Sequence, residues 1–207
     1  MPALTLDRLL ASIGFGSRKE ARALVRMGLV ELEGNVLDDP FMELKERPEN
    51  ITVNGEEVPT VEKLYIMLHK PVDFECSHHP RDHRSVYELL PDRFSAMGIQ
   101  SAGRLDADSS GIILFSNQGD FIHKVESPKK GCLKRYRVTL AREIVREEGS
   151  VVITIGEGLY HQVRRMFAAV GNHVETLERI SIGPLVLDET LGEGGWRFLT
   201  DEEIASL

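Results

Sequence analysis

The polar loop over residues 103–111 holds the side chains of this chain best suited to chemistry. Asp106, Asp108 and Ser110 stand at positions 1, 3 and 5 of a calcium-binding EF-hand loop. Position 12, where such a loop needs a bidentate glutamate, is Asn117, and the flanking segments are predicted to be strands rather than helices. A calcium site is therefore disfavoured. The remaining alternatives are a plain polar loop before a buried strand and a loop that carries a catalytic carboxylate.

A second group of side chains that bind metals in other proteins is Cys76, His78, His79 and His83. Their spacing does not match a zinc finger, and no second Cys/His pair follows at zinc-ribbon spacing. We therefore expect no metal ion at these residues. With Cys132 the chain has two cysteines and no export signal, which predicts reduced thiols in a cytoplasmic protein.

The composition is that of a globular protein with an excess of acid. The 207 residues leave room for a small domain and a medium one, and no apolar run is long enough to span a membrane. The net charge of −8 argues against a nucleic-acid partner, because phosphate contacts need Lys and Arg. The acids, however, concentrate at 31–62, 143–148 and 188–203, whereas the bases cluster elsewhere.

Residues 4–58 are predicted to form a compact unit of two helices followed by short strands. Apolar residues repeat at helical spacing from Leu6 to Ile13, which predicts the first helix. Ser17 is a good N-cap for the second helix, with Glu20 three residues on as its capping-box partner. Strands and turns are expected at 30–37 and 51–55.

The second predicted helix carries a basic stripe. Arg18, Arg22 and Arg26 recur every four residues and therefore share one face of that helix. The stripe alone is compatible with a solvated surface or with a face that binds phosphates.

Beyond a short linker around Pro59, strands outnumber helices. Strands are predicted at 65–69, 111–115, 134–140, 151–155 and 177–182, and helices at 162–170 and 200–207. This pattern predicts an α+β domain built on a mixed, mainly antiparallel sheet. We expect the domain boundary between residues 60 and 61, which gives domains 1–60 and 61–207.

The first domain resembles a known RNA-binding module. The positions that carry the resemblance are Arg8-Leu9, Gly14, Ser17–Ala21, Gly28–Val30, Gly34 and Val53–Gly55. Their order resembles the module of the ribosomal-protein S-four type. The resemblance implies that the second helix lies against RNA, with phosphate contacts from Arg18, Lys19, Arg22 and Arg26.

The second domain matches a series of motifs in the order of one enzyme family. These segments are Lys70-Pro71, Gly103–Asp106, Lys134–Val138, Glu157–Met166 and Leu177–Gly183. They resemble the motifs of pseudouridine synthases, and together with the first domain they resemble the small-subunit rRNA (RsuA-type) group. The resemblance implies the pseudouridine synthase fold and an enzyme without metal or cofactor.

The chemistry of that family explains the residue types. The reaction breaks the N1–C1′ bond of a uridine, turns the base and rejoins it through C5. The resemblance implies that Asp106 is the catalytic carboxylate, acting as nucleophile or as base. Tyr136 would face the flipped base with its hydroxyl near C5, and Arg164 would pair with Asp106 and keep that carboxylate ionised.

The remaining site residues are also implied by the resemblance. The pocket walls would include Arg104, Leu105, Leu177 and Ile180. Further RNA contacts would come from Lys70, Lys134 and Arg165. His161 is expected to be structural.

The partner implied is rRNA or a ribosomal assembly intermediate, bound by a monomer away from membranes. The implied target is 16S rRNA, of the uridine-516 type. The alternatives are 23S rRNA and a non-catalytic rRNA-binding assembly protein. The stretch 141–150 is shorter than in relatives, so an RNA contact at that place is in doubt.

Overall fold

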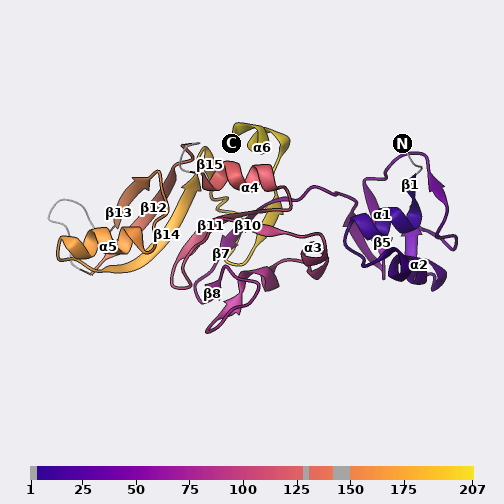
Figure 1. Ribbon diagram of the computed structural model, residues 1–207, viewed down its shortest axis with the longest axis horizontal. Helices are drawn as coiled ribbons and strands as arrows, with labels where there is room; N and C mark the ends of the chain where they lie inside the picture. The colour runs from indigo at the N-terminus through magenta and orange to yellow at the C-terminus, as the bar shows by residue number, and fades with distance from the viewer. Residues whose placement is uncertain (1–3, 128–130, 142–149) are drawn as a thin grey trace. The chain divides into compact units, whose positions relative to one another are not determined.

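The computed structural model describes residues 4–127, 131–141 and 150–207. The chain divides into two compact units, which are taken separately below (Figure 1). The N-terminal unit is Met1–Leu64 with Pro91–Ile99, and the sheet unit is Tyr65–Leu90 with Gln100–Leu207. Most of the shortened stretch at 141–150 lies outside the described residues. None of the described helices is long and apolar enough to cross a membrane.

Within residues 4–58 the N-terminal unit contains the two predicted helices and short strands. The helices are α1 (Leu6–Ser12) and α2 (Arg18–Arg26), with α3 (Asp92–Ala96) from the second segment of the unit. The antiparallel sheet has the order β3-β2-β5-β6, formed by Asn35–Val36, Val30–Leu32, Asn50–Val53 and Glu56–Pro59. A separate pair joins β1 (Leu4–Thr5) to β4 (Glu43–Leu44).

The core of this unit confirms the predicted helix faces. Leu6 and Leu10 of α1 are fully buried and pack with Val25 of α2 and Val53 of β5. Such burial is worth roughly 2 kcal/mol for each large side chain. The apolar spacing in the sequence therefore fixes how α1 and α2 sit on the sheet.

The sheet unit is built on one large sheet with the order β13-β12-β14-β11-β7-β16. These strands are Ser150–Ile155, Lys134–Leu140, Val174–Ile182, Ser110–Ser116, Tyr65–Lys70 and Trp196–Phe198. At its margins β10 (Gln100–Ala102) pairs with β11, and β15 (Leu185–Val186) pairs with β14. Within this sheet β11 and β14 run parallel and the other pairs are antiparallel, so the predicted mixed, mainly antiparallel sheet is confirmed.

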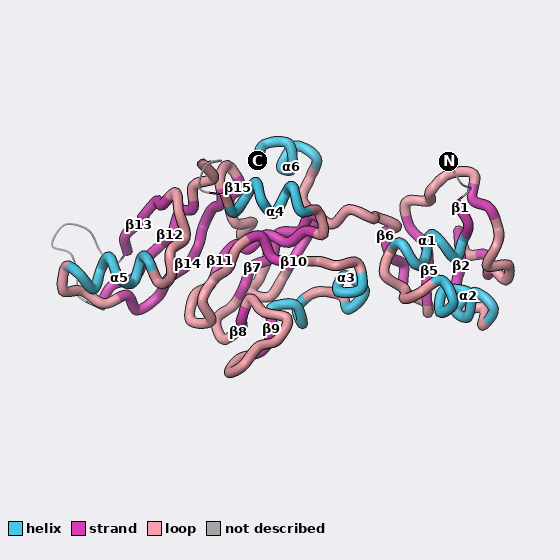
Figure 2. Tube along the Cα trace, viewed as in Figure 1, coloured by secondary structure: helices cyan, strands magenta, loops and turns pink. Residues whose placement is uncertain are grey.

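Short helices and a small strand pair complete the sheet unit (Figure 2). They are β8 (Phe74–Glu75), β9 (Arg84–Ser85), the 3-10 helix η1 (Val86–Leu89), α4 (Gly119–Glu126), α5 (Gln162–Ala169) and α6 (Asp201–Ser206). Helix α4 lies along β10 and β11, whereas α5 lies beside β12 and β14 (Figure 1). The loop between β10 and β11 therefore lies between the strands next to α4 and the strands next to α5, which are β12 and β14.

Candidate active site

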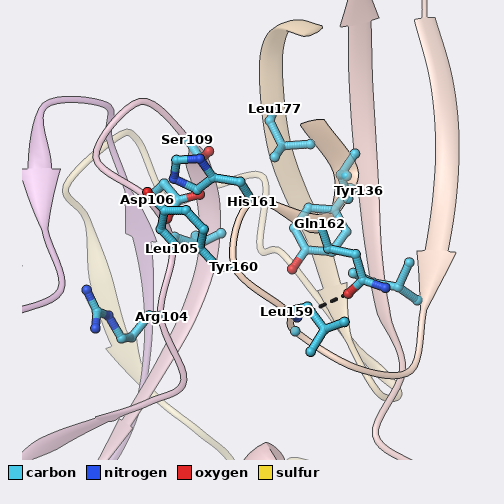
Figure 3. A pocket seen from close by; sticks show the side chains of 13 residues that line it. Arg104, Leu105, Asp106, Ser109, Tyr136, Leu159, Tyr160, His161, Gln162 and Leu177 are labelled. Carbon is cyan, nitrogen blue, oxygen red and sulfur yellow. Dashed lines mark hydrogen bonds and ion pairs between the residues drawn. The ribbon is translucent and has the colours of Figure 1, made fainter. Parts of the chain in front are cut away.

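A pocket of about 360 Å³ opens between the β10–β11 loop, strands β12 and β14, and the start of α5 (Figure 3). Five residues predicted for the site line it: Arg104, Leu105, Asp106, Tyr136 and Leu177. The lining that the sequence did not predict consists of Ser109, Ile155 and residues 158–163. The structure thus brings together residues that lie more than 70 positions apart in the chain.

The loop that carries Asp106 is held in place by the side chain of Lys70, the last residue of β7. The Lys70 side chain is fully buried. Its Nζ donates hydrogen bonds to the carbonyl oxygens of Pro71 (2.9 Å), Asp106 (3.1 Å) and Ser109 (2.7 Å). Burial lowers the pKa of the Lys70 ammonium. The prediction that Lys70 contacts RNA is wrong, because a buried ammonium bound to three carbonyls cannot reach a phosphate.

Two further side chains hold the backbone of the same loop. Arg179 of β14 is buried and donates from Nε to the Ile112 carbonyl (2.8 Å) and from Nη1 to the Arg104 carbonyl (3.4 Å). The Leu105 amide donates to the Cys76 sulfur (3.4 Å), and burial raises the pKa of that thiol. The neutral Cys76 thiol and the buried Arg179 side chain therefore both help to hold the backbone of the loop in place.

The Asp106 side chain projects from this fastened loop into the pocket. It is 40 % exposed, and its Oδ2 lies 3.5 Å from Nε2 of His161. His161 was expected to be structural, yet it lines the pocket beside the carboxylate. The position of His161 in the segment 157–166 was the signal in the sequence. Its left-handed backbone (φ 48°) at the N-cap of α5 could not be foreseen there.

Tyr136 stands on β12, across the pocket from Asp106 (Figure 3). Its ring is largely buried in a cluster with Leu105, Val163 and Leu177. Its hydroxyl end is directed toward the space between β12 and the Asp106 loop (Figure 3). The pocket thus has a carboxylate on one side and an aromatic, apolar wall on the other.

Ile180 was predicted as a pocket wall and is not among the residues that line the pocket. In β14 the register with β12 shifts between Arg179, which pairs with Tyr136, and Ser181, which pairs with Arg135, so Ile180 falls at this irregularity. Leu177 lies on the regularly paired part of the strand and lines the pocket. The prediction of Ile180 as a pocket wall is therefore wrong.

Arg164 reaches the Asp106 loop but does not make the predicted ion pair. Its Nη2 lies 3.0 Å from Oδ2 of Asp108, and its Nη1 donates to the Val174 carbonyl (3.0 Å). The predicted ion pair between Arg164 and Asp106 is therefore wrong, because Arg164 pairs with Asp108. The hydrogen bond to the Val174 carbonyl holds the Arg164 guanidinium beside the start of β14. The carboxylate that it reaches there is that of Asp108, two positions after Asp106.

Lys134 was also predicted to contact RNA and instead points into the unit. Its Nζ donates to the carbonyls of Val125 (2.8 Å) and Cys132 (2.7 Å). Val125 belongs to the last turn of α4, where free carbonyls favour a cation. Burial lowers the pKa of Lys134. The prediction for Lys134 is wrong, because this ammonium caps a helix.

The basic stripe of α2 is organised by a buried acid. Arg18 Nη2 and Arg22 Nε lie 3.0 and 2.8 Å from Oδ2 of Asp7, whose side chain is fully buried. Burial raises the pKa of Asp7, but hydrogen bonds from Thr5, Arg22 and Arg18 outweigh it and lower that pKa to about 2. Arg18 and Arg22 thus pair with Asp7, and Arg18, Lys19 and Arg26 are exposed on α2.

Over the described ranges, no group of three or more His, Cys, Asp or Glu side chains is arranged to hold a metal ion. Two of the Cys and His residues at 76–83 have other contacts. Cys76 binds the Leu105 backbone, and His78 stacks on Tyr87 with ring centroids 3.7 Å apart.

Comparison with known proteins identifies the family. Residues 64–155 match the model of the RNA pseudouridylate synthase family, and residues 4–47 match that of the S4 domain. The chain belongs to the RNA pseudouridylate synthase family and is an isomerase. A crystal structure of a pseudouridylate synthase has 32% sequence identity and a TM-score of 0.66, with 99% of each chain covered.

Two curated relatives cover nearly the whole chain. The proteins called ribosomal small subunit pseudouridine synthase A from Vibrio parahaemolyticus and Vibrio cholerae are each 38% identical to it, with 99% of both chains covered. The alignment with the first runs over 235 positions, more than the 207 residues of this chain. That relative therefore carries residues that this chain lacks.

Proposed function

We propose that this chain converts a uridine of 16S rRNA in the small ribosomal subunit to pseudouridine, with Asp106 as the catalytic carboxylate. The observation that carries the proposal is the Asp106 side chain, which projects from a fastened loop into a pocket walled by Tyr136 and Leu177. The names of the relatives at 38% identity support the small subunit as the target. A site of the uridine-516 type is the specific proposal.

The pocket suits one nucleotide that has left its stack. A base inside a helix cannot be reached by a side chain, so the target uridine is flipped out of the RNA. A volume of about 360 Å³ lies at the small end of ligand pockets. The Tyr136 ring and the Leu177 side chain supply the aromatic and apolar surface that receives the uracil.

The reaction is an isomerisation in which no atom is gained or lost. The Asp106 carboxylate acts as nucleophile or as base while the N1–C1′ bond breaks, and the turned base then forms the C5–C1′ bond. The Tyr136 hydroxyl assists removal of the C5 proton, and N1 ends protonated. The buried cations of Lys70 and Arg179 place positive charge behind the loop that carries Asp106.

The two domains have separate roles in this proposal. Residues 1–60 hold the rRNA through the S4 module, and residues 61–207 perform the reaction. Phosphate contacts come from the exposed cations Lys19, Arg26, Arg104 and Arg165. Arg18 and Arg22 contribute mainly by fixing α2 on Asp7.

The proposal is tested by replacing Asp106 with Asn. Wild-type protein, Asp106→Asn and Asp120→Asn are incubated with unmodified 16S rRNA and with its assembly intermediate, and carbodiimide adducts map pseudouridine. Asp120→Asn is the matched control, because Asp120 is exposed at the start of α4, away from the pocket. We expect one modified uridine with the wild type and the control, and none with Asp106→Asn.

Each alternative has its own outcome in this experiment. Full modification by Asp106→Asn would refute the role of that carboxylate. Pseudouridine formed in 23S rRNA and absent from 16S rRNA would make the large subunit the target. Binding of rRNA by the wild type without any pseudouridine would leave a ribosome-assembly protein that holds RNA and does not react with it.

A further inference from the structure

Two aromatic rings stack on each other beside the Asp106 carboxylate. The ring centroids of Tyr160 and His161 lie 3.8 Å apart, with an angle of 16° between the ring planes. Successive side chains normally diverge, and the left-handed backbone of His161 (φ 48°, ψ 33°) allows these two to face each other. Only a few per cent of residues other than glycine adopt this conformation, so the pair depends on an unusual turn.

The stacked pair reaches from the carboxylate to open solvent. His161 contacts Asp106 at 3.5 Å, whereas the Tyr160 side chain is 76 % exposed. Both rings stand on the same side of the pocket as Asp106, across from Tyr136 (Figure 3). The neighbouring Leu159 is 58 % exposed as well. An open aromatic face therefore adjoins the place where the target uridine is proposed to bind.

The chemistry around this face fits a nucleobase. Unpaired bases are commonly bound by stacking on aromatic side chains, while nearby cations hold the phosphates. The exposed Arg104 lines the same pocket, and the exposed Arg165 lies on α5 four positions after His161. An aromatic face flanked by two arginines is complementary to single-stranded RNA.

We infer that the Tyr160–His161 pair is a stacking site for the base next to the target uridine, an inference that rests on the proposed function. When the uridine leaves its stack to enter the pocket, each neighbouring base loses one stacking partner. The Tyr160 ring replaces that partner for one neighbour, which offsets part of the cost of flipping. The site thus takes two consecutive nucleotides, one between Asp106 and Tyr136 and one on Tyr160.

The test is a thermodynamic cycle between the ring and the base. All proteins carry Asp106→Asn so that the RNA is not altered during the measurement, and the RNA is a fragment containing the target uridine. Affinity is measured for Tyr160 and for Tyr160→Leu, each with intact RNA and with RNA abasic at the 5′ neighbour, the 3′ neighbour or the target itself. Stacking on an aromatic ring predicts that Tyr160→Leu weakens binding about 5- to 150-fold.

The expected result is coupling between Tyr160 and one neighbour. RNA abasic at that neighbour binds Tyr160 and Tyr160→Leu about equally, because the contact is already lost. Tyr160→Phe keeps the ring and is expected to bind intact RNA within about twofold of Tyr160. Matching thermal unfolding curves for Tyr160→Leu and Tyr160→Phe exclude a folding defect.

The other outcomes overturn the inference. Additive effects at both neighbours mean that no base stacks on Tyr160, and coupling to the target position alone means that the ring packs on the uracil. The wild type is assayed in parallel for pseudouridine formation in the intact fragment. Failure of that assay refutes the proposed function itself, whereas modification without coupling refutes the stacking site alone.

Discussion

Replacing Lys70 with Met is expected to destabilise the loop that carries Asp106 without affecting RNA affinity. The change removes the donor to three carbonyl oxygens, those of Pro71, Asp106 and Ser109. A buried acceptor left without a partner costs roughly 1–3 kcal/mol. Relief from burying a charge offsets part of this loss. We expect the free energy of unfolding of the sheet unit to fall by about 3 kcal/mol.

Trp196 provides the readout of stability. It is the single tryptophan of the chain, and it lies on β16 opposite Leu68 of β7, the strand that ends at Lys70. Urea unfolding followed by its fluorescence therefore reports on the right part of the sheet. A displacement of Asp106 by about 1 Å is expected to slow the single-turnover rate roughly 100-fold.

The salt dependence of RNA affinity distinguishes a purely structural role of Lys70 from a contact between Lys70 and a phosphate. Loss of one phosphate contact lowers the slope of log K against log salt by about 0.7 to 0.9. We expect no change of slope for Lys70→Met. The control Arg165→Met, an exposed position on α5, is expected to lower the slope with no loss of stability. A lowered slope with an unchanged urea midpoint for Lys70→Met would refute the reasoning.

Two further predictions concern Asp7 and Gly111. The pKa of Asp7 is about 2 in the folded protein against 3.8 for the free side chain, so the unfolded chain binds more protons between these values. About 2 kcal/mol of stability is therefore present above pH 4 and lost as the pH falls toward 2. Amide exchange in α1 and α2, corrected for intrinsic rates, is expected to show this loss in the wild type and not in Asp7→Asn; equal pH dependence in both would contradict it. Gly111 has φ +111°, and a Cβ there would overlap the backbone of Arg179, so Gly111→Ala is expected to cost at least about 3 kcal/mol in thermal unfolding. Gly119→Ala, where a Cβ meets open space, is the control; equal melting temperatures for the two variants would count against the overlap.

Features decided by residues close in sequence were predictable. The capping boxes of Ser17 with Glu20 and of Thr200 with Glu203 are confirmed, because each pair lies three positions apart. Strand β12 covers the predicted residues 134–140, since its alternating side chains carry their own signal. The short helix α4 was missed, because the turn residues before Gly119 hid its apolar spacing.

Features decided by distant strands were not predictable in the same way. Lys70 and Lys134 were predicted to contact RNA from the resemblance to the family. The burial of Lys70 depends on carbonyls of the β10–β11 loop, up to 39 positions away, which only the folded sheet brings to it. The partner of Arg164 could not be chosen between Asp106 and Asp108 from spacing alone. The position of Ile180 depends on the irregular register between β14 and β12, which the alternation within one strand does not reveal.

The hydrogen bonds between Arg179 and the Asp106 loop have a consequence for biosynthesis. Arg179 comes 67 positions after Ile112, whose carbonyl it binds, and it belongs to one of the last strands of the sheet. A chain emerging from the ribosome therefore presents its Asp106 loop with two anchors, Lys70 and Cys76, and lacks the third, Arg179, until β14 has been translated. Nascent chains that stop short of β14 would hold every residue of the carboxylate loop and still have no working pocket.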